Sequence, residues 1–153
     1  MTIYNYSGPG GHVTIPAQIY GIPVTVIGDY IFKTERYIET TETIYLYLRN
    51  LISSVSIPDT VTYIGYNAFN NNKLTDIIIP DSVTFIEIDA FTNNNLSSIR
   101  IGENVKFTYK YTGSIFSDHA FDYNFDNFYI ENGRKAGLYK RFFVGNDFIW
   151  ILQ

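Results

Sequence analysis

Two adjacent stretches of the chain have almost the same sequence. Residues 57–74 read IPDTVTYIGYNAFNNNKL and residues 79–96 read IPDSVTFIEIDAFTNNNL, so the repeat has a period of 22 residues. A fixed period of about 20–50 residues is typical of repeat proteins, in which each unit buries its apolar face by stacking on a neighbour. The chain is therefore predicted to fold as a solenoid.

The repeat extends in both directions from these two copies. A third copy begins at Ile99, has Gly102 in place of the proline, and returns to the pattern at Ala120 and Phe121. An earlier copy lies within residues 13–32. We expect one domain with an N-terminal cap at residues 1–12, about four repeats at 13–127 and a C-terminal β cap at 128–153. Two insertions, at residues 33–51 and 107–116, interrupt the repeats.

Short runs of β-branched residues recur once per unit, at residues 55–57, 77–79 and 99–101. Turn-forming residues bound each run, which is typical of strands. Stacked in register, the runs form a short parallel sheet with two inward columns of side chains. The predicted columns are Val55, Ile77 and Ile99, and Ile57, Ile79 and Ile101. The Ala-Phe pairs at 68–69 and 90–91 are expected on short helical or 3-10 turns at the far side, which makes the fold mostly β.

The end of the chain departs from the repeat. Residues 128–131, 134–144 and 148–152 read as strands, and Asn132-Gly133 between the first two is a strong hairpin signal. A terminal hairpin would cover the last unit, whose apolar face and edge would otherwise be exposed. The apolar run 148–152 is expected to form the core of this cap rather than to anchor a membrane or a partner.

Asparagines also recur at the repeat period, as Asn71 with Asn93 and Asn72 with Asn94. Stacked amides can form a polar binding strip, or they can satisfy the backbone of the turns. The second interpretation is favoured because amides are frequent in turns.

Composition argues against several functions. The net charge of −4, from 11 basic and 15 acidic residues mixed along the chain, gives no basic footprint for nucleic acid. No apolar run approaches the ~18–20 residues that span a bilayer, so membrane insertion is not expected. The absence of cysteine excludes a thiol nucleophile and a Cys-ligated zinc site.

Catalytic and metal chemistry is not indicated either. The two histidines, His12 and His119, lack the partners of a catalytic triad at a workable geometry. Residues 122–127 begin like a calcium loop, but they lack the glycine at the sixth position, and Gly133 replaces the glutamate at the twelfth. We therefore expect no catalytic residue, no metal and no cofactor.

The pattern Ile-Pro-Asp-Ser/Thr-Val-Thr-x-Ile-x-x-x-Ala-Phe, present twice, resembles the BspA-like, treponemal-type leucine-rich repeat. The opening around residues 11–29 resembles the start of such arrays, and residues 132–139 with Trp150 resemble a module that often follows them. The resemblance implies a right-handed leucine-rich-repeat solenoid on a secreted or surface-attached bacterial protein that adheres to host proteins or other cells. It carries over no catalytic residue.

A candidate binding face follows from strand alternation, because residues next to the buried columns point outward. The face comprises Thr14, Ser56, Asp76, Ile78, Ser98 and Arg100. The leading hypothesis is a non-catalytic module that binds a protein or cell-surface ligand. The alternatives are a binding site on the 33–51 insertion, and a spacer that associates with itself through residues 148–152 or 45–47.

Overall fold

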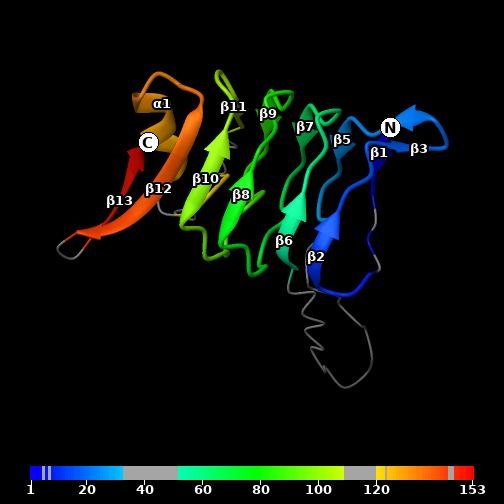
Figure 1. Cartoon of the computed structure of the whole chain (residues 1–153), viewed down its shortest axis with the longest axis horizontal. Helices are drawn as coiled ribbons and strands as arrows, with labels where there is room; N and C mark the ends of the chain where they lie inside the picture. The colour runs from blue at the N-terminus through cyan, green and yellow to red at the C-terminus, as the bar shows by residue number, and fades with distance from the viewer. Residues whose placement is uncertain (5, 7, 33–51, 109–119, 123, 145–146) are drawn as a thin grey trace, which may run out of the picture.

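The computed structural model describes residues 1–4, 6, 8–32, 52–108, 120–122, 124–144 and 147–153. Repeat units stack side by side along the molecule (Figure 1). The described elements are β1 (Thr2–Ile3), β2 (Gly11–Thr14), β3 (Gln18–Ile19), β4 (Ile22–Pro23), β5 (Val26–Ile27), β6 (Ile52–Ser56), β7 (Tyr63–Ile64), β8 (Asp76–Ile78), β9 (Phe85–Ile86), β10 (Ser98–Ile101), β11 (Lys106–Phe107), α1 (Phe125–Glu131), β12 (Gly137–Val144) and β13 (Asp147–Leu152). The insertion predicted at 33–51, and residues 109–116 of the second insertion, lie outside the described residues.

The predicted parallel sheet is present, but it is divided. A four-stranded sheet has the order β13-β12-β10-β8, with β8 and β10 parallel and in the predicted register of Ile77 opposite Ile99. Strands β2 and β6 form a separate parallel pair, in which Val13 lies opposite Val55. Figure 1 shows β6 beside β8, so the two sheets follow each other along one side of the molecule.

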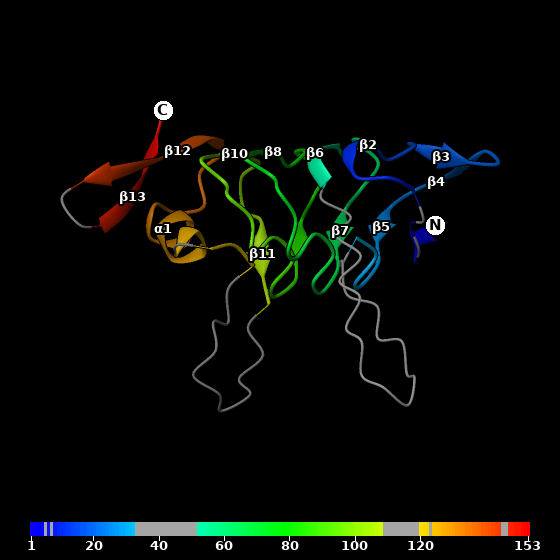
Figure 2. The ribbon, with the colours of Figure 1, turned by 90° about the horizontal axis from the view of Figure 1, so that it is seen from below.

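A second parallel sheet runs along the molecule and was not predicted. Its order is β1-β5-β7-β9-β11, and Ile27, Ile64 and Ile86 occupy successive positions in its register. Figure 2 shows β5, β7 and β11 on a different side of the molecule from β2, β6, β8 and β10. Each of these strands has only two residues, which is too short for a periodic hydrophobic signal.

The predicted columns are buried where the four-stranded sheet is continuous. Ile77, Ile79, Ile99 and Ile101 are all buried in the core. Val55 and Ile57 are only partly buried, so the two columns weaken at β6, where the ladder from β8 does not continue.

This inward and outward alternation gives a stability prediction. Replacing the buried Ile79 by alanine is expected to lower the free energy of unfolding by about 2–5 kcal/mol, because it leaves a cavity in the core. Ile78 is 64% exposed, so Ile78→Ala is expected to cost about 0.5 kcal/mol or less. Urea denaturation of both variants checks the difference, and equal losses would contradict the assignment of the two faces.

The far side consists of hydrogen-bonded turns, not of the helical or 3-10 turns predicted there. The Ala68 N–H donates to Gly65 and the Ala90 N–H donates to Glu87, as in a single tight turn. Asn67 and Asp89 then take left-handed conformations, with φ of 54° and 57°. Short Asn and Asp side chains tolerate this conformation, and its positive φ interrupts a right-handed helix.

Phenylalanines stack from unit to unit behind these turns. Phe32, Phe69, Phe91 and Phe121 are all buried, and successive ring centroids lie 4.9, 5.1 and 4.8 Å apart with interplanar angles of 12°, 11° and 8°. Such rings bury large apolar area, and each pair adds about 0.5–1.5 kcal/mol beyond that burial. The stack joins neighbouring units through one side of the core.

The buried asparagines satisfy backbone groups, as the favoured interpretation had it. The Asn94 amide nitrogen donates to the carbonyls of Phe91 and Phe69, each at 2.9 Å, and its oxygen accepts the Leu74 N–H at 3.0 Å. Asn72 repeats this pattern one unit earlier, with the carbonyl of Phe69. Asn72 and Asn94 are structural residues that tie each unit to its neighbour.

The predicted strand at 128–131 is wrong, because these residues belong to the helix α1. Gly133 has a φ of +72°, its N–H donates to Ile130, and the Arg134 N–H donates to Tyr129. These two bonds form a Schellman motif, in which glycine ends a helix. The Asn132-Gly133 pair therefore ends α1 and does not connect two strands of a hairpin.

The C-terminal hairpin consists instead of β12 and β13, with β12 antiparallel to β10. The expectation that residues 148–152 form cap core holds for only part of the run. Trp150 is 4% exposed and packs on Phe125, whereas Phe148, Ile149 and Ile151 are exposed. The end of the hairpin projects beyond the stacked units (Figure 1). None of these three exposed side chains belongs to the described core or packs against it.

Candidate interaction face

The six residues of the predicted binding face lie on the outer side of the two sheets formed by β2, β6, β8, β10, β12 and β13. Thr14, Ser56, Asp76, Ile78 and Arg100 are exposed, and Ser98 is half-buried. The structure brings them together in register, because Thr14 lies opposite Ser56 and Arg100 lies opposite Ile78. We call this surface the front face.

The C-terminal hairpin extends the front face, and this extension was not predicted. Arg100 lies opposite Leu138, and Ser98 lies opposite Lys140, which in turn lies opposite Ile151. Phe142 and Ile149 form the next pair on the same side of the hairpin. The front face therefore also includes Leu138, Lys140, Phe142, Ile149 and Ile151.

Side chains alternate between the two faces of a strand, so a strand predicted within residues 134–144 could have indicated which hairpin residues share one side. Sequence alone could not place them beside Ile78 and Arg100, because that placement depends on the register of β12 against β10.

The character of the front face changes along its length. At β2 and β6 it is polar, since a His12 ring nitrogen lies 2.8 Å from the Ser54 hydroxyl and the other lies 3.2 Å from the Thr14 hydroxyl. From β8 to β13 it carries the exposed apolar side chains of Ile78, Phe142, Ile149 and Ile151. A gathering of exposed large apolar side chains is the surface feature that most often marks an interaction site.

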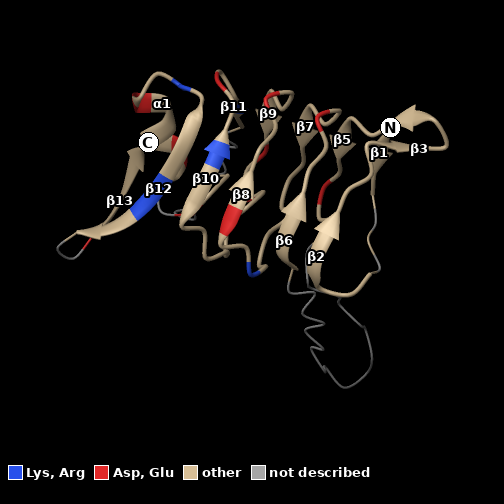
Figure 3. Ribbon diagram, in the orientation of Figure 1, with Lys and Arg blue, Asp and Glu red and all other residues tan. Residues whose placement is uncertain are grey.

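Charged side chains lie among these apolar residues. Figure 3 shows basic residues on β10 and β12 and an acidic residue on β8. Arg100 lies between Ile78 and Leu138 in the register, and Lys140 lies between Ser98 and Ile151. The front face thus combines apolar contact area with cations. Of the two basic residue types, Arg is enriched at protein interfaces and Lys is depleted.

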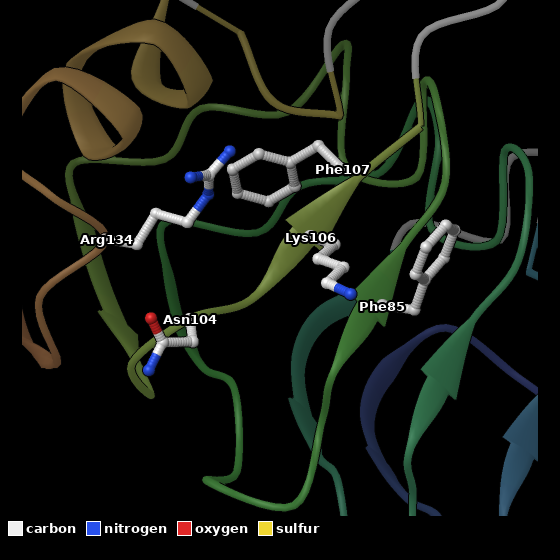
Figure 4. A pocket seen from close by; sticks show the side chains of 5 residues that line it. All are labelled: Phe85, Asn104, Lys106, Phe107 and Arg134. Atoms are coloured by element: carbon white, nitrogen blue, oxygen red, sulfur yellow. The ribbon is translucent and has the colours of Figure 1, made fainter.

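A shallow pocket of about 390 Å³ lies away from the front face, beside the second sheet. Phe85 from β9, Lys106 and Phe107 from β11, Asn104 from the preceding loop and Arg134 after α1 line it (Figure 4). Next to it, the Tyr63 hydroxyl donates to a Glu87 oxygen. Burial, then this hydrogen bond, raises the pKa of Tyr63 above its usual range, so the ring stays neutral at physiological pH.

The residues that resemble a calcium loop bind backbone groups instead. Both oxygens of the fully buried Asp126 accept backbone N–H groups, from Ala120 and Phe121. Asp122 accepts the N–H of Asn94 at 3.0 Å. No group of three potential metal ligands occurs within the described ranges.

This arrangement gives a prediction for calcium. Millimolar calcium is expected to leave the melting temperature unchanged within error, because the carboxylates of Asp122 and Asp126 already accept backbone hydrogen bonds. Differential scanning fluorimetry with and without a chelator checks this. A rise in melting temperature that the chelator reverses would show that a calcium site exists.

In the part of the chain that the structure describes, no helix is long and apolar enough to cross a bilayer.

Comparisons with known proteins place the chain in a family. No curated protein matches the sequence. Among solved structures, the chain is similar to a leucine-rich cell surface protein from Faecalibacterium prausnitzii A2-165, with 21% identity and a TM-score of 0.33. That match covers 65% of this chain and 50% of that protein, so the chain spans half of its length.

The family model that matches is the BspA type leucine-rich repeat region, described as having six copies. It matches residues 41–132, which is more than half of the 153 residues. The match covers both full copies of the repeat and the third copy. The chain belongs to the BspA-type leucine-rich-repeat family.

Proposed function

We propose that the chain is a non-catalytic protein-binding module of a secreted or cell-surface protein, and that it attaches to a protein or cell-surface ligand through the front face. The observation that carries the proposal is the row of exposed apolar side chains from Ile78 on β8 to Ile151 on β13, with Arg100 and Lys140 among them. Leucine-rich repeats of this family generally mediate protein interactions, which supports the same function.

The proposal includes an architecture. The chain is a right-handed solenoid and one domain, with residues 1–12 as an N-terminal cap, 13–127 as about four repeats and 128–153 as a C-terminal cap. The stacked phenylalanines and the repeated asparagine contacts support this arrangement, because both recur once per unit. A rigid stack of this kind holds the front face in one shape, which lowers the entropic cost of binding.

Binding to immobilised proteins tests the proposal. The purified chain is passed over a panel of extracellular-matrix and plasma proteins, and each saturable interaction is measured again with the double variant Ile78→Asp, Arg100→Glu. We expect the double variant to lose at least tenfold in affinity, because it places a carboxylate in the apolar row and reverses the neighbouring cation. Both residues are exposed, so folding is expected to stay nearly intact.

The matched control is Ile22→Asp. Ile22 is an exposed apolar residue like Ile78, but it lies on β4, outside the front face. We expect this variant to bind like the unaltered chain. Binding that survives the double variant but is lost on deleting residues 33–51 would move the site to that insertion, which lies outside the described residues.

A second candidate function is self-association, in which the chain is a spacer or assembly element. The exposed apolar residues of the C-terminal hairpin favour it, because Phe142, Phe143 and Ile149 lack cover from the rest of the described chain. Sedimentation at several micromolar concentrations separates the two functions. A dimer that becomes monomeric in the variant Phe142→Glu, Ile149→Glu would support self-association, and a monomer at all concentrations would contradict it.

A further inference from the structure

The pocket beside the second sheet contains two cations and no acidic residue. Lys106 and Arg134 line it together with Asn104, Phe85 and Phe107. Neither cation makes an ion pair with any residue of the described part of the chain, and the Arg134 Nε is buried without a hydrogen-bond partner. The Nε is closed to solvent, so a ligand would meet the terminal guanidinium nitrogens of Arg134 and not the Nε.

The backbone fixes the two polar residues on one wall of the pocket. Asn104 and Arg134 both have left-handed conformations, with φ of 59° and 53°. The Asn104 N–H donates to the Arg134 carbonyl at 3.0 Å, and the Arg134 N–H donates to Tyr129 at the end of α1. These hydrogen bonds hold Asn104 and Arg134 next to each other at the end of α1.

Aromatic rings form the neighbouring wall. Phe85 lies in the pocket, and its ring is parallel to that of Tyr63, with an interplanar angle of 5° and centroids 5.7 Å apart. Both residues are half-buried on the outer side of the second sheet, so they present apolar ring surface to solvent. Figure 4 shows the Lys106 side chain extending toward Phe85 and the Arg134 side chain toward Phe107.

We propose that this pocket binds an acidic oligosaccharide, with one carboxylate at Lys106, a second carboxylate at Arg134 and a sugar ring against Phe85. A guanidinium matches a carboxylate in a planar, two-bonded geometry, and the Asn104 amide can bond a hydroxyl. One face of a pyranose ring carries only C–H groups, which suits a flat apolar wall. A pocket of about 390 Å³ lies within the range of about 300–1,000 Å³ that holds small ligands.

A peptide carboxylate is the weaker candidate. An acidic side chain of a peptide would use the two cations, but its flexible methylene groups would leave the flat ring of Phe85 largely uncovered. The proposed ligand uses the cations, the amide and the rings together. The pocket is separate from the front face, so the test of this proposal is independent of the test of the proposed function.

Isothermal titration calorimetry of the whole chain with trigalacturonic acid tests the proposal. Its methyl ester is the matched neutral ligand, and a short glutamate peptide supplies carboxylates without sugar rings. We expect saturable binding of the acid in 150 mM salt, at least tenfold weaker binding of the ester, and at least tenfold weaker binding of the peptide. Equal binding of the acid and the ester, equal binding of the peptide, or no binding of the acid would overturn the proposal.

Variants locate the site. Lys106→Gln, Arg134→Gln and Phe85→Leu are each expected to weaken binding of the acid at least tenfold. Lys73→Gln, which removes an exposed cation outside both the pocket and the front face, is the matched control and is expected to have no effect. Lys106 is exposed, so its variant keeps the test valid even where Arg134→Gln destabilises the chain. Full binding by Lys106→Gln and Phe85→Leu would place the ligand elsewhere.

Discussion

Replacing Phe91 by alanine is expected to lower the free energy of unfolding by about 3–5 kcal/mol, one of the largest effects of any single substitution in this chain. Phe91 is fully buried between Phe69 and Phe121, with ring centroids 5.1 and 4.8 Å away. The substitution leaves a ring-sized cavity and removes two stacking contacts at once. Urea denaturation followed by tyrosine and tryptophan fluorescence measures the loss.

The matched control is Phe85→Ala, which lies on β9 in the same unit. Phe85 also stacks on a ring in the neighbouring unit, but it lies on the outer side of the second sheet and is half-buried. Its loss is expected to be clearly smaller than that of Phe91. Equal losses would show that the stack of buried phenylalanines does not dominate the stability of the repeats.

Replacing Asp126 by alanine is expected to cost about 3–6 kcal/mol, because two hydrogen bonds to a buried carboxylate, each worth about 1.5–3 kcal/mol, are lost together. Asp126 is fully buried, and its two oxygens accept the N–H groups of Ala120 and Phe121. Those N–H groups follow the segment 109–119 and begin the turn that carries the last phenylalanine of the stack. Chemical denaturation measures the loss.

Two asparagine variants make this prediction specific. Asp126→Asn keeps the shape of the side chain but leaves one oxygen for two N–H groups. It is therefore expected to lower the free energy of unfolding by more than half as much as Asp126→Ala does. Asp122→Asn, in which the side chain accepts the N–H of Asn94 and is only partly buried, is expected to cost less than Asp126→Asn. A stable Asp126→Asn variant would contradict the role assigned to this carboxylate.

The repeat and its buried columns could be predicted because a fixed period forces equivalent residues to stack. Ile79 and Ile101 are buried and Ile78 is exposed for this reason, which follows from the alternation of a strand. The structural role of Asn72 and Asn94 could be anticipated in the same way, since a polar residue repeated in a turn has backbone groups of the next unit within reach.

The remaining features depend on information that local patterns do not contain. The second sheet uses strands of two residues, such as Tyr63–Ile64, which leave no periodic signal. An Asn-Gly pair fits both a hairpin turn and the end of a helix, and the burial of Phe125 and Tyr129 on one side of α1 decides for the helix. The part of the front face on β12 and β13 depends on strand register across a long separation in sequence.

Site-specific photo-crosslinking tests the role of the front face most directly. A photoreactive phenylalanine analogue is placed at position 78, 142 or 22. Each protein is irradiated in complex with the extracellular-matrix or plasma protein to which the unaltered chain binds saturably. We predict crosslinks from positions 78 and 142, on the exposed side of β8 and β12, and none from position 22 on β4. Crosslinks from position 22 without any from 78 and 142 would contradict the assignment of the front face as the binding surface.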